Sequence, residues 1–366
     1  MIASFPAAIL MLAAVLPPHR PLRILIVSDT VNPHGLSSSD LTEAGDIGNA
    51  LRQPGTGISL DPAVDAVYEV PTNDIELATA ELLLPACDPG SYDVLVYFSH
   101  RIPLPDAGKP LGPQVRQDQF TDAVTAFLLS GGGMVSFHHG SYFATGKEGI
   151  LQLIGATANG SVPWNTVDGQ NVIATAPGHF VTDNGVTYSG NVVYQDLARG
   201  VPNASYAYFN NTPDERYPSF NYNGTAFFTT TLFASNYNEG GTTHLLGFTH
   251  RRAPWSGIVV GYQPGEYQPN ALDNLSGNNF QILANAILYA ADARRRNALV
   301  LTVEKGPGAG ETSLQWSAGQ GDYTVYRGTD PARVTDRCDR QGTTTATTWV
   351  DAPPSAGIVY YQVSGP

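Results

Sequence analysis

Two adjacent histidines stand where an apolar run of the chain meets a turn of small residues. The run is Met134–Phe137, within the stretch GGGMVSFHHGSYF that begins at Gly131. In α/β enzymes a strand that ends at such a turn carries the nucleophile, and small residues flank it because the turn is crowded. In SFHHG (136–140) the central position is His138. Because an imidazole gains or loses a proton near neutral pH, the spacing predicts acid–base chemistry.

Covalent catalysis at this turn is disfavoured, because no cysteine lies there. Cys87 and Cys338 are its two cysteines, and neither lies near a comparable turn. Without a thiolate there is no thioester route, so a glutaminase mechanism is excluded. The two cysteines are too few for a disulfide framework. A serine hydrolase that uses Ser136 or Ser141 is a weak alternative, because neither serine holds the central position.

Other side chains are expected to meet His138 at the same edge of the sheet. His34 follows the first strand-like run, and ligand sites of such sheets form beyond the carboxyl ends of the strands. Carboxylates nearby would orient an imidazole. The predicted catalytic residues are His138, His34, Asp214 and Glu215, and the predicted substrate-binding residues are His139, Tyr142, Asp196 and Glu266. Two histidines and a carboxylate would also suit Zn²⁺, but no HExxH-type spacing occurs, so no metal site is predicted and the cofactor is unknown.

Each of these residues also has a structural interpretation. His138 could be bonded to backbone at a tight turn, although we expect it at the N-terminus of a helix, where the dipole favours a neutral imidazole. Tyr142, Trp164 and Trp255 could stack on sugar rings or anchor loops to the core. Four further histidines are interpreted as structural or loop-fixing: His100, His179, His244 and His250.

The hydrophobic pattern predicts an α/β fold with a doubly wound, mainly parallel sheet. Strands are expected at Leu22–Ser28, Asp93–Phe98 and Met134–Phe137. Helices are expected at Asn73–Leu84, with Asn73 as the N-cap, and at Pro113–Leu129, where Phe120, Val124, Phe127 and Leu128 share one face.

The texture becomes β-rich further along the chain. Short strands are predicted at Ala226–Phe233, His244–Thr249 and Gly257–Tyr262, and a helix at Phe280–Ala291 completes the domain. The resulting boundaries are 1–20 for a signal peptide or tail, 21–294 for the α/β domain and 298–366 for a small β module. Its segments 314–316, 323–327 and 358–363 alternate and resemble a fibronectin type III sandwich, which usually serves as a spacer.

Composition limits the partners. The 366 residues carry 19 basic and 32 acidic side chains, a net charge of −13. This balance argues against nucleic acid and against an anionic membrane surface, since both are bound through Lys and Arg. The apolar run Ala7–Leu16 is too short to span a bilayer and resembles a signal-peptide core. We therefore expect a secreted or periplasmic protein whose pockets hold neutral polar ligands.

Several motifs, in order, resemble the trehalose-utilisation (ThuA-like) family, which has a flavodoxin-like, class I glutamine amidotransferase-like fold. The resemblance covers Leu22–Ala291 and rests on VNPHG (31–35), FHHGS (137–141), IGA (154–156), PGHFVT (177–182) and QPG (263–265), followed by ILANAILYAA (282–291). Two features depart from the family. Glu266 stands where a histidine is typical, and either Asp196 or Asp214–Glu215 can be aligned with the acidic Asp-Glu-x-Tyr motif.

The resemblance implies a role in carbohydrate metabolism. The expected partner is a neutral carbohydrate or glycoside, acted on by His138 with the help of His34 and a carboxylate. The competing class is a non-catalytic extracellular module that binds carbohydrate or serves as a scaffold. The sequence leaves open whether the protein is an enzyme.

Overall fold

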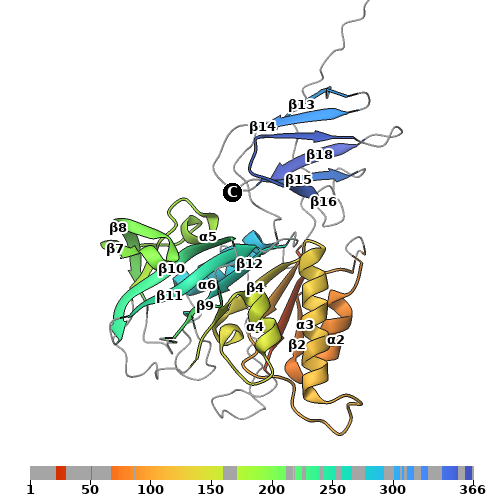
Figure 1. The fold of residues 1–366 in the computed structure, drawn as a ribbon, viewed down its shortest axis with the longest axis vertical. Coiled ribbons are helices and arrows are strands. Elements are labelled where there is room, and N and C mark those ends of the chain that lie inside the picture. Colours follow the sequence, from red (N-terminus) through yellow and green to blue (C-terminus); the bar gives the residue numbers. More distant parts are fainter. Residues whose placement is uncertain are drawn as a thin grey trace, which may run out of the picture.

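The large sheet that the sequence predicts is present, and it has two differently built halves. A computed structural model describes residues 22–29, 51, 67–85, 88, 90–159, 171–211, 217, 219–224, 228–239, 242–251, 257–265, 277–291, 301–305, 307–308, 311–316, 323–328, 340–352 and 359–364. Within these ranges the main sheet has ten strands in the order β2-β1-β3-β4-β12-β11-β10-β6-β8-β7 (Figure 1).

The first half is parallel and contains four of the predicted strands together with β2, which was not predicted. It consists of β2 (Val67–Pro71), β1 (Ile24–Ser28), β3 (Val94–Tyr97), β4 (Gly133–Phe137) and β12 (Val259–Tyr262). Numbered along the chain, the order 2-1-3-4-5 is that of flavodoxin-like sheets. The predicted α/β class with a large parallel central sheet is therefore confirmed.

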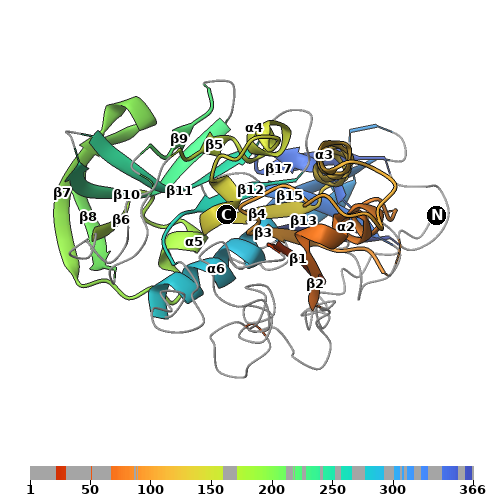
Figure 2. The same cartoon turned by 90° about the horizontal axis from the view of Figure 1, so that it is seen from below.

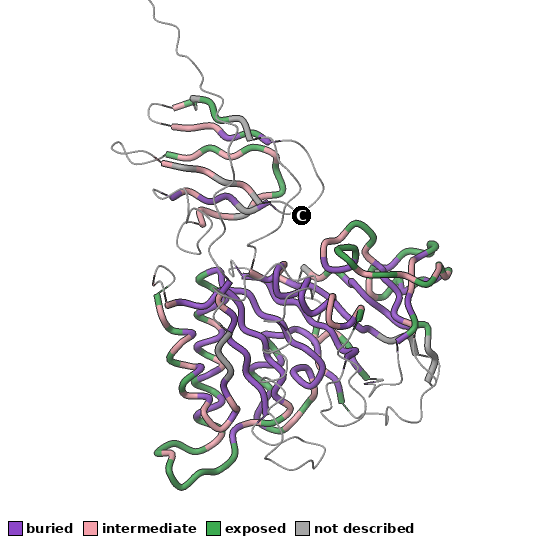
Figure 3. Tube along the Cα trace, turned by 180° about the vertical axis from the view of Figure 1, so that it is seen from behind, coloured by how far each residue is buried: buried purple, intermediate pink, exposed green. Residues whose placement is uncertain are grey.

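Helices cover both faces of this half. Leu25 and Val27 of β1 pack in one apolar cluster with α2 (Ile75–Leu82) and α3 (Pro113–Leu129). Ile24 and Ile26, which alternate with them, pack in the opposite cluster with α6 (Gly277–Ala290). Figure 2 shows α6 and the α2–α3 pair separated by the strands, and Figure 3 shows the buried strands between the partly exposed helices. This arrangement explains the continuous apolar runs, since the central strands are buried on both faces.

The second half of the sheet is antiparallel, which the expectation of a mainly parallel sheet did not include. It is built from β11 (Thr242–Arg251), β10 (Phe228–Glu239), β6 (Asn171–Ala174), β8 (Val201–Asn210) and β7 (Gly190–Asp196). β11 pairs with β12 of the parallel half, so the two halves form one continuous sheet. Shorter elements lie between the strands: η1 (Thr72–Asp74), η2 (His138–Ser141), α4 (Glu148–Ile154), β5 (Ala156–Thr157), α5 (Phe180–Asp183), η4 (Leu197–Arg199) and β9 (Asn221–Tyr222).

The C-terminal residues form two three-stranded antiparallel sheets. One contains β13 (Leu301–Lys305), β14 (Thr312–Trp316) and β17 (Thr348–Asp351), and the other contains β16 (Arg340–Thr344), β15 (Tyr323–Gly328) and β18 (Tyr360–Ser364). Leu314 and Trp316 from the first sheet share an apolar cluster with Tyr323 and Val325 from the second. These six strands are the described elements of this part of the chain.

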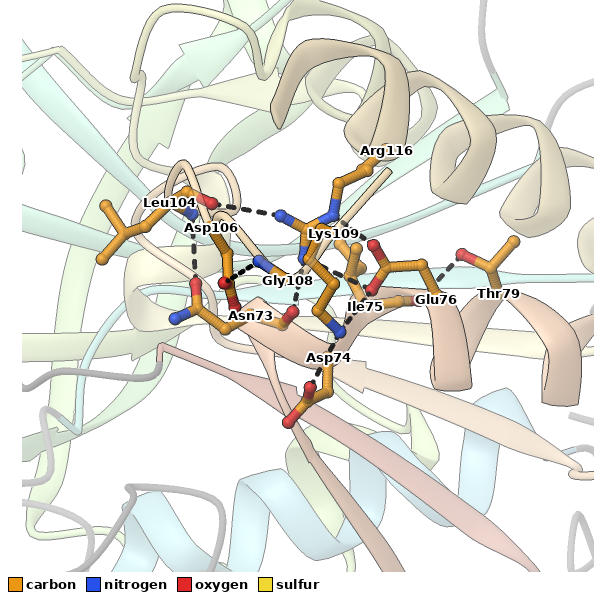
Figure 4. A network of polar contacts seen from close by, with 10 residues as sticks. All are labelled: Asn73, Asp74, Ile75, Glu76, Thr79, Leu104, Asp106, Gly108, Lys109 and Arg116. Carbon is orange, nitrogen blue, oxygen red and sulfur yellow. Dashed lines mark hydrogen bonds and ion pairs between the residues drawn. The ribbon is translucent and has the colours of Figure 1, made fainter. Parts of the chain in front are cut away.

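A polar network ties the segment after β3 to the start of α2 (Figure 4). The fully buried guanidinium of Arg116, on α3, donates to the carboxylate of Glu76, to the Asn73 carbonyl and to the Leu104 carbonyl. The prediction that Asn73 caps α2 is wrong. Its side-chain oxygen instead accepts a hydrogen bond from the Leu104 amide at 3.1 Å. Its role is to fix the loop that leads from β3 to α3. No helix among the described residues has the length and apolar character needed to cross a membrane.

Candidate functional site

The carboxyl ends of β1, β3, β4 and β12 converge around the turn that holds the two histidines. His138 follows β4 directly and has φ 43°, the one positive φ among the non-glycine residues described. A left-handed conformation at a non-glycine residue costs on the order of 1 kcal/mol and recurs at functional turns. The predicted elbow is therefore present. It opens the short 3-10 turn η2 rather than an α-helix, so the expected helix dipole is absent from His138.

The imidazole of His138 is held in one tautomer. Its Nδ1 lies 2.7 Å from the carbonyl oxygen of Gln263, just after β12. A carbonyl can only accept, so Nδ1 carries a proton and donates it. In the neutral ring this leaves Nε2 as the basic nitrogen, and the Tyr217 hydroxyl lies 3.4 Å from it. This is the orientation that a proton-accepting histidine requires.

His138 belongs to a cluster of five rings that contact one another in sequence. The rings of His138 and His139 are 4.3 Å apart between centroids, and His139 stacks on His100 at 5.1 Å with an interplanar angle of 18°. Tyr142 meets the edge of His100 at 4.5 Å and the ring of Tyr217 at 5.2 Å. His100 and Tyr142 are partly exposed, so they form the outer side of the cluster.

Burial is where the site departs most from the sequence-based expectation. His138 is 2% exposed, His139 is 1% exposed and Tyr217 is 2% exposed. The sequence suggests an imidazole that opens onto the ligand crevice, whereas the ring lies beneath neighbouring side chains.

A buried lysine, Lys147, is hydrogen-bonded to the backbone of the turn. The fully buried amine of Lys147 donates to backbone carbonyls at both the end of β3 and the turn itself. Burial lowers the pKa of Lys147 to about 7, and the carboxylate of Asp29 opposes this effect. Asp29 follows β1 and accepts from the Ser99 hydroxyl and from the amides of His100 and Arg101. These contacts fill the space between the ends of β1 and β3.

Small residues of the SFHHG segment serve to close the turn. A Cβ on Gly140 would lie 2.2 Å from the Tyr97 carbonyl oxygen, so only glycine fits against β3 there. The hydroxyls of Ser136 and Ser141 are both buried and lie 2.8 Å apart. They brace the two ends of the turn, which gives no support to the serine hydrolase alternative.

The predicted site residues fall into three groups. His138, His139 and Tyr142 come together. Asp196 does not join them, because it lies at the end of β7, which five strands separate from β4 in the sheet order, and it pairs with Arg199. Several residues lie outside the described part of the chain: His34, Asp214, Glu215, Glu266, Trp164, Trp255, Cys87, Cys338 and the apolar run Ala7–Leu16.

Two members of the ring cluster were not among the predicted site residues. His100, interpreted as structural, follows β3 just as His138 follows β4, and this shared position was the available signal. Tyr217 is the tyrosine of Asp214-Glu215-Arg216-Tyr217, so its motif was noticed but its side chain was not assigned a role. Recognising either one required the strand order as well as the sequence.

The other histidines of the described chain have structural roles, as predicted. His179 caps α5, where its Nδ1 accepts from the Val181 amide at 3.2 Å. His250 is buried against Gly155, where a Cβ would lie 2.3 Å from the imidazole ring. The side chain of His244 lies outside the described residues. Within the described ranges, no three His, Cys, Asp or Glu side chains gather in a way that could hold a metal ion.

The chain has only distant similarity to known proteins, in sequence and in structure. No family model and no curated protein matches this chain. Among solved structures, a ThuA-like protein of Bacteroides uniformis is 12% identical, with 76% of this chain and 95% of that chain covered and a TM-score of 0.45. A ThuA-like protein of Parabacteroides merdae is 14% identical, with 74% and 90% covered and a TM-score of 0.41. Because these scores lie below 0.5, the fold class rests on the observed strand order.

Proposed function

We propose that this protein is a ThuA-like protein of carbohydrate metabolism that transfers a proton to or from a neutral sugar or glycoside through His138. The observation that carries this proposal is the tautomer: Nδ1–H is bonded to the Gln263 carbonyl, which leaves Nε2 as a base that faces a hydroxyl. The ordered motifs of the sequence supply the family assignment. The histidine turn replaces the thiol of an amidotransferase, so no glutaminase activity is expected.

The contacts suggest how a proton would move. Nε2 accepts a proton from a sugar hydroxyl, either directly or after the Tyr217 hydroxyl has passed its own proton on and taken the sugar's. As the ring becomes an imidazolium, the Gln263 carbonyl accepts a charge-assisted hydrogen bond from Nδ1–H and stabilises the new charge. Return of the proton to a leaving oxygen makes the same residue the acid.

The ring cluster suits a carbohydrate partner. The C–H faces of sugars are apolar and pack against aromatic rings, and Tyr142 and His100 supply the partly exposed rings of the cluster. The carboxylates in our proposal are Asp214 and Glu215, because they share a sequence motif with Tyr217, which contacts His138. His34 and Glu266 remain proposed members of the site, whereas Asp196 is no longer one, because it lies at the far edge of the sheet.

The second candidate is a secreted module that binds carbohydrate without turning it over. The burial of His138 favours it, and so does the two-sheet C-terminal part, which we propose to be a fibronectin type III-like spacer. Under both candidate functions we propose that the protein is exported to the periplasm or the medium, as the N-terminal apolar run suggests.

The test is a turnover and binding screen with trehalose, maltose and other neutral glycosides, together with their keto-sugar forms. Wild type is compared with His138→Ala and with His179→Ala, which removes a histidine outside the cluster. The catalytic proposal expects turnover to fall by about 10²–10⁴-fold in His138→Ala alone. Equal turnover in wild type and His138→Ala would overturn it, and binding with no turnover in any protein would favour the second candidate.

A further inference from the structure

Lys147 occupies an unusual position for a charged residue. It is 0% exposed, although Lys side chains are almost never fully buried without a partner. It immediately precedes α4, and its side chain points back beneath the turn that begins at His138. Its Nζ lies 5.3 Å from the centre of the Tyr97 ring.

The amine joins two segments that are distant in the sequence. Nζ lies 2.6 Å from the carbonyl oxygen of Ser99, 3.0 Å from that of Tyr142, 3.1 Å from that of Gly140 and 3.3 Å from that of His139, so its three N–H groups are shared among four acceptors. The first carbonyl follows β3 and the other three belong to the histidine turn. A single cation therefore links the turn to the neighbouring strand, and backbone carbonyls are acceptors that no change of side chain removes.

We propose that Lys147 is the positioning residue of the site: its ammonium group fixes the turn from His139 to Tyr142 and so holds the His138 imidazole against the Gln263 carbonyl. Lys147 contacts neither ring nitrogen of His138, so it acts through the backbone. The functional meaning of this inference rests on the proposed function, but the positioning itself does not.

The charged and titratable groups around the amine support this role. Asp29 supplies the opposite charge from the end of β1, and its oxygens bind the same 99–101 segment that Lys147 holds through the Ser99 carbonyl. The phenol of Tyr97 faces the amine from β3, while His139 belongs to the turn and His100 stacks on it. Cation and carboxylate thus fix both sides of one junction.

Protonation decides how strongly the amine can hold the turn. An ammonium group has three N–H donors, whereas a neutral amine has two and a lone pair that repels the remaining carbonyls. Burial lowers the pKa of Lys147 to about 7, so the two forms exchange in an accessible pH range. We therefore expect the hydrogen bonds to the turn to be strongest below that pH, although burying the ammonium group there costs the folded chain stability.

The first test needs neither a variant nor a ligand. Carbonyl ¹³C chemical shifts of the full-length protein are followed by NMR from pH 6 to pH 9. The carbonyls of Ser99, Gly140 and Tyr142 are expected to shift together with one midpoint near pH 7, since they share one donor. Shifts that do not move, or that move with unrelated midpoints, would overturn the proposal.

The second test uses Lys147→Met, which keeps the length of the side chain and removes the charge. Its ring ¹⁵N spectrum is expected to show His138 as a mixture of tautomers, where wild type shows only the Nδ1–H form. Lys109→Met is the matched control, because Lys109 pairs with Asp74 and Glu76 away from the turn, and it should keep the wild-type tautomer.

A folded Lys147→Met protein with the wild-type tautomer would contradict the inference. If this variant does not fold, the carbonyl titration of wild type decides alone. Neither spectrum depends on a sugar, so a failed screen for turnover would leave the positioning result standing, and the reverse also holds.

Discussion

At the scale of single residues, His138 combines a strained backbone with an imidazole whose two nitrogens have different roles. The backbone of His138 has φ 43°, and its Nδ1–H donates a hydrogen bond to the Gln263 carbonyl. Strain at a buried residue persists only where the surroundings over-determine it. Here the surroundings are the Tyr217 hydroxyl, the ring of His139 and the closed turn below.

The backbone at position 138 makes a prediction about substitutions. Asn enters the left-handed region more readily than Ala does. We expect His138→Asn to be more stable than His138→Ala by about 1 kcal/mol, with both less stable than wild type. Urea unfolding of the three proteins measures the order. An Ala variant at least as stable as the Asn variant would show that the observed φ is not maintained.

The fit of Gly140 against β3 makes a second prediction. Gly140→Ala places a methyl group 2.2 Å from the Tyr97 carbonyl oxygen, and the turn must move to accept it. We expect a loss of about 1–3 kcal/mol in the free energy of unfolding. Gly224→Ala is the control, since a Cβ there would meet nothing within 4 Å. Equal stability of the two variants would contradict the close approach.

At the scale of elements, the site is held by loops that are fixed at their far ends. The loop from β3 to α3 begins with His100 and is anchored by the Arg116 network to the start of α2 (Figure 4). Burial raises the pKa of the Glu76 carboxyl. The hydrogen bond and charge of Arg116 and the charge of Lys109 outweigh this effect, so the pKa lies below its ordinary value.

Arg116→Met tests this anchor. Removing the guanidinium leaves the Asn73 and Leu104 carbonyls without their buried donor, so we expect unfolding to become easier by about 1–3 kcal/mol. A Glu76 carboxylate with a lowered pKa stabilises the fold above its unfolded pKa and loses this effect as the pH falls through its folded pKa. The difference between wild type and Arg116→Met should therefore shrink below about pH 4. A difference that grows on acidification would argue against the pair.

At the scale of the whole molecule, the sequence predicts the parallel half well and the setting of the site poorly. α3 has the limits Pro113–Leu129 that its apolar face predicts, because a helix of that length has a clear period. For the antiparallel half the sequence predicts short strands but not how they pair, since pairing between distant segments leaves no local signal. His138 was placed at its turn by spacing alone, but its burial depends on Tyr217 and Gln263, which are distant in sequence.

The buried lysine makes the stability of the whole chain depend on pH. Its folded pKa of about 7 lies below the ordinary 10.5, so between these values the unfolded chain binds more protons. The contribution is complete above pH 10.5 and is lost as the pH falls through about 7, so stability should rise from pH 7 to pH 9. We expect a gain on the order of 2 kcal/mol in guanidinium unfolding of wild type relative to Lys147→Met. The same slope in both proteins would contradict the shift.

The central claim is that Nε2 of His138 carries the proton in the reaction. Its most direct measurement is kcat for wild type and His138→Asn on the sugar that the screen turns over best, with binding of that sugar measured in parallel by calorimetry. The account predicts that the variant binds the sugar with similar affinity and loses at least about 100-fold in kcat. A variant that keeps the wild-type kcat would contradict it.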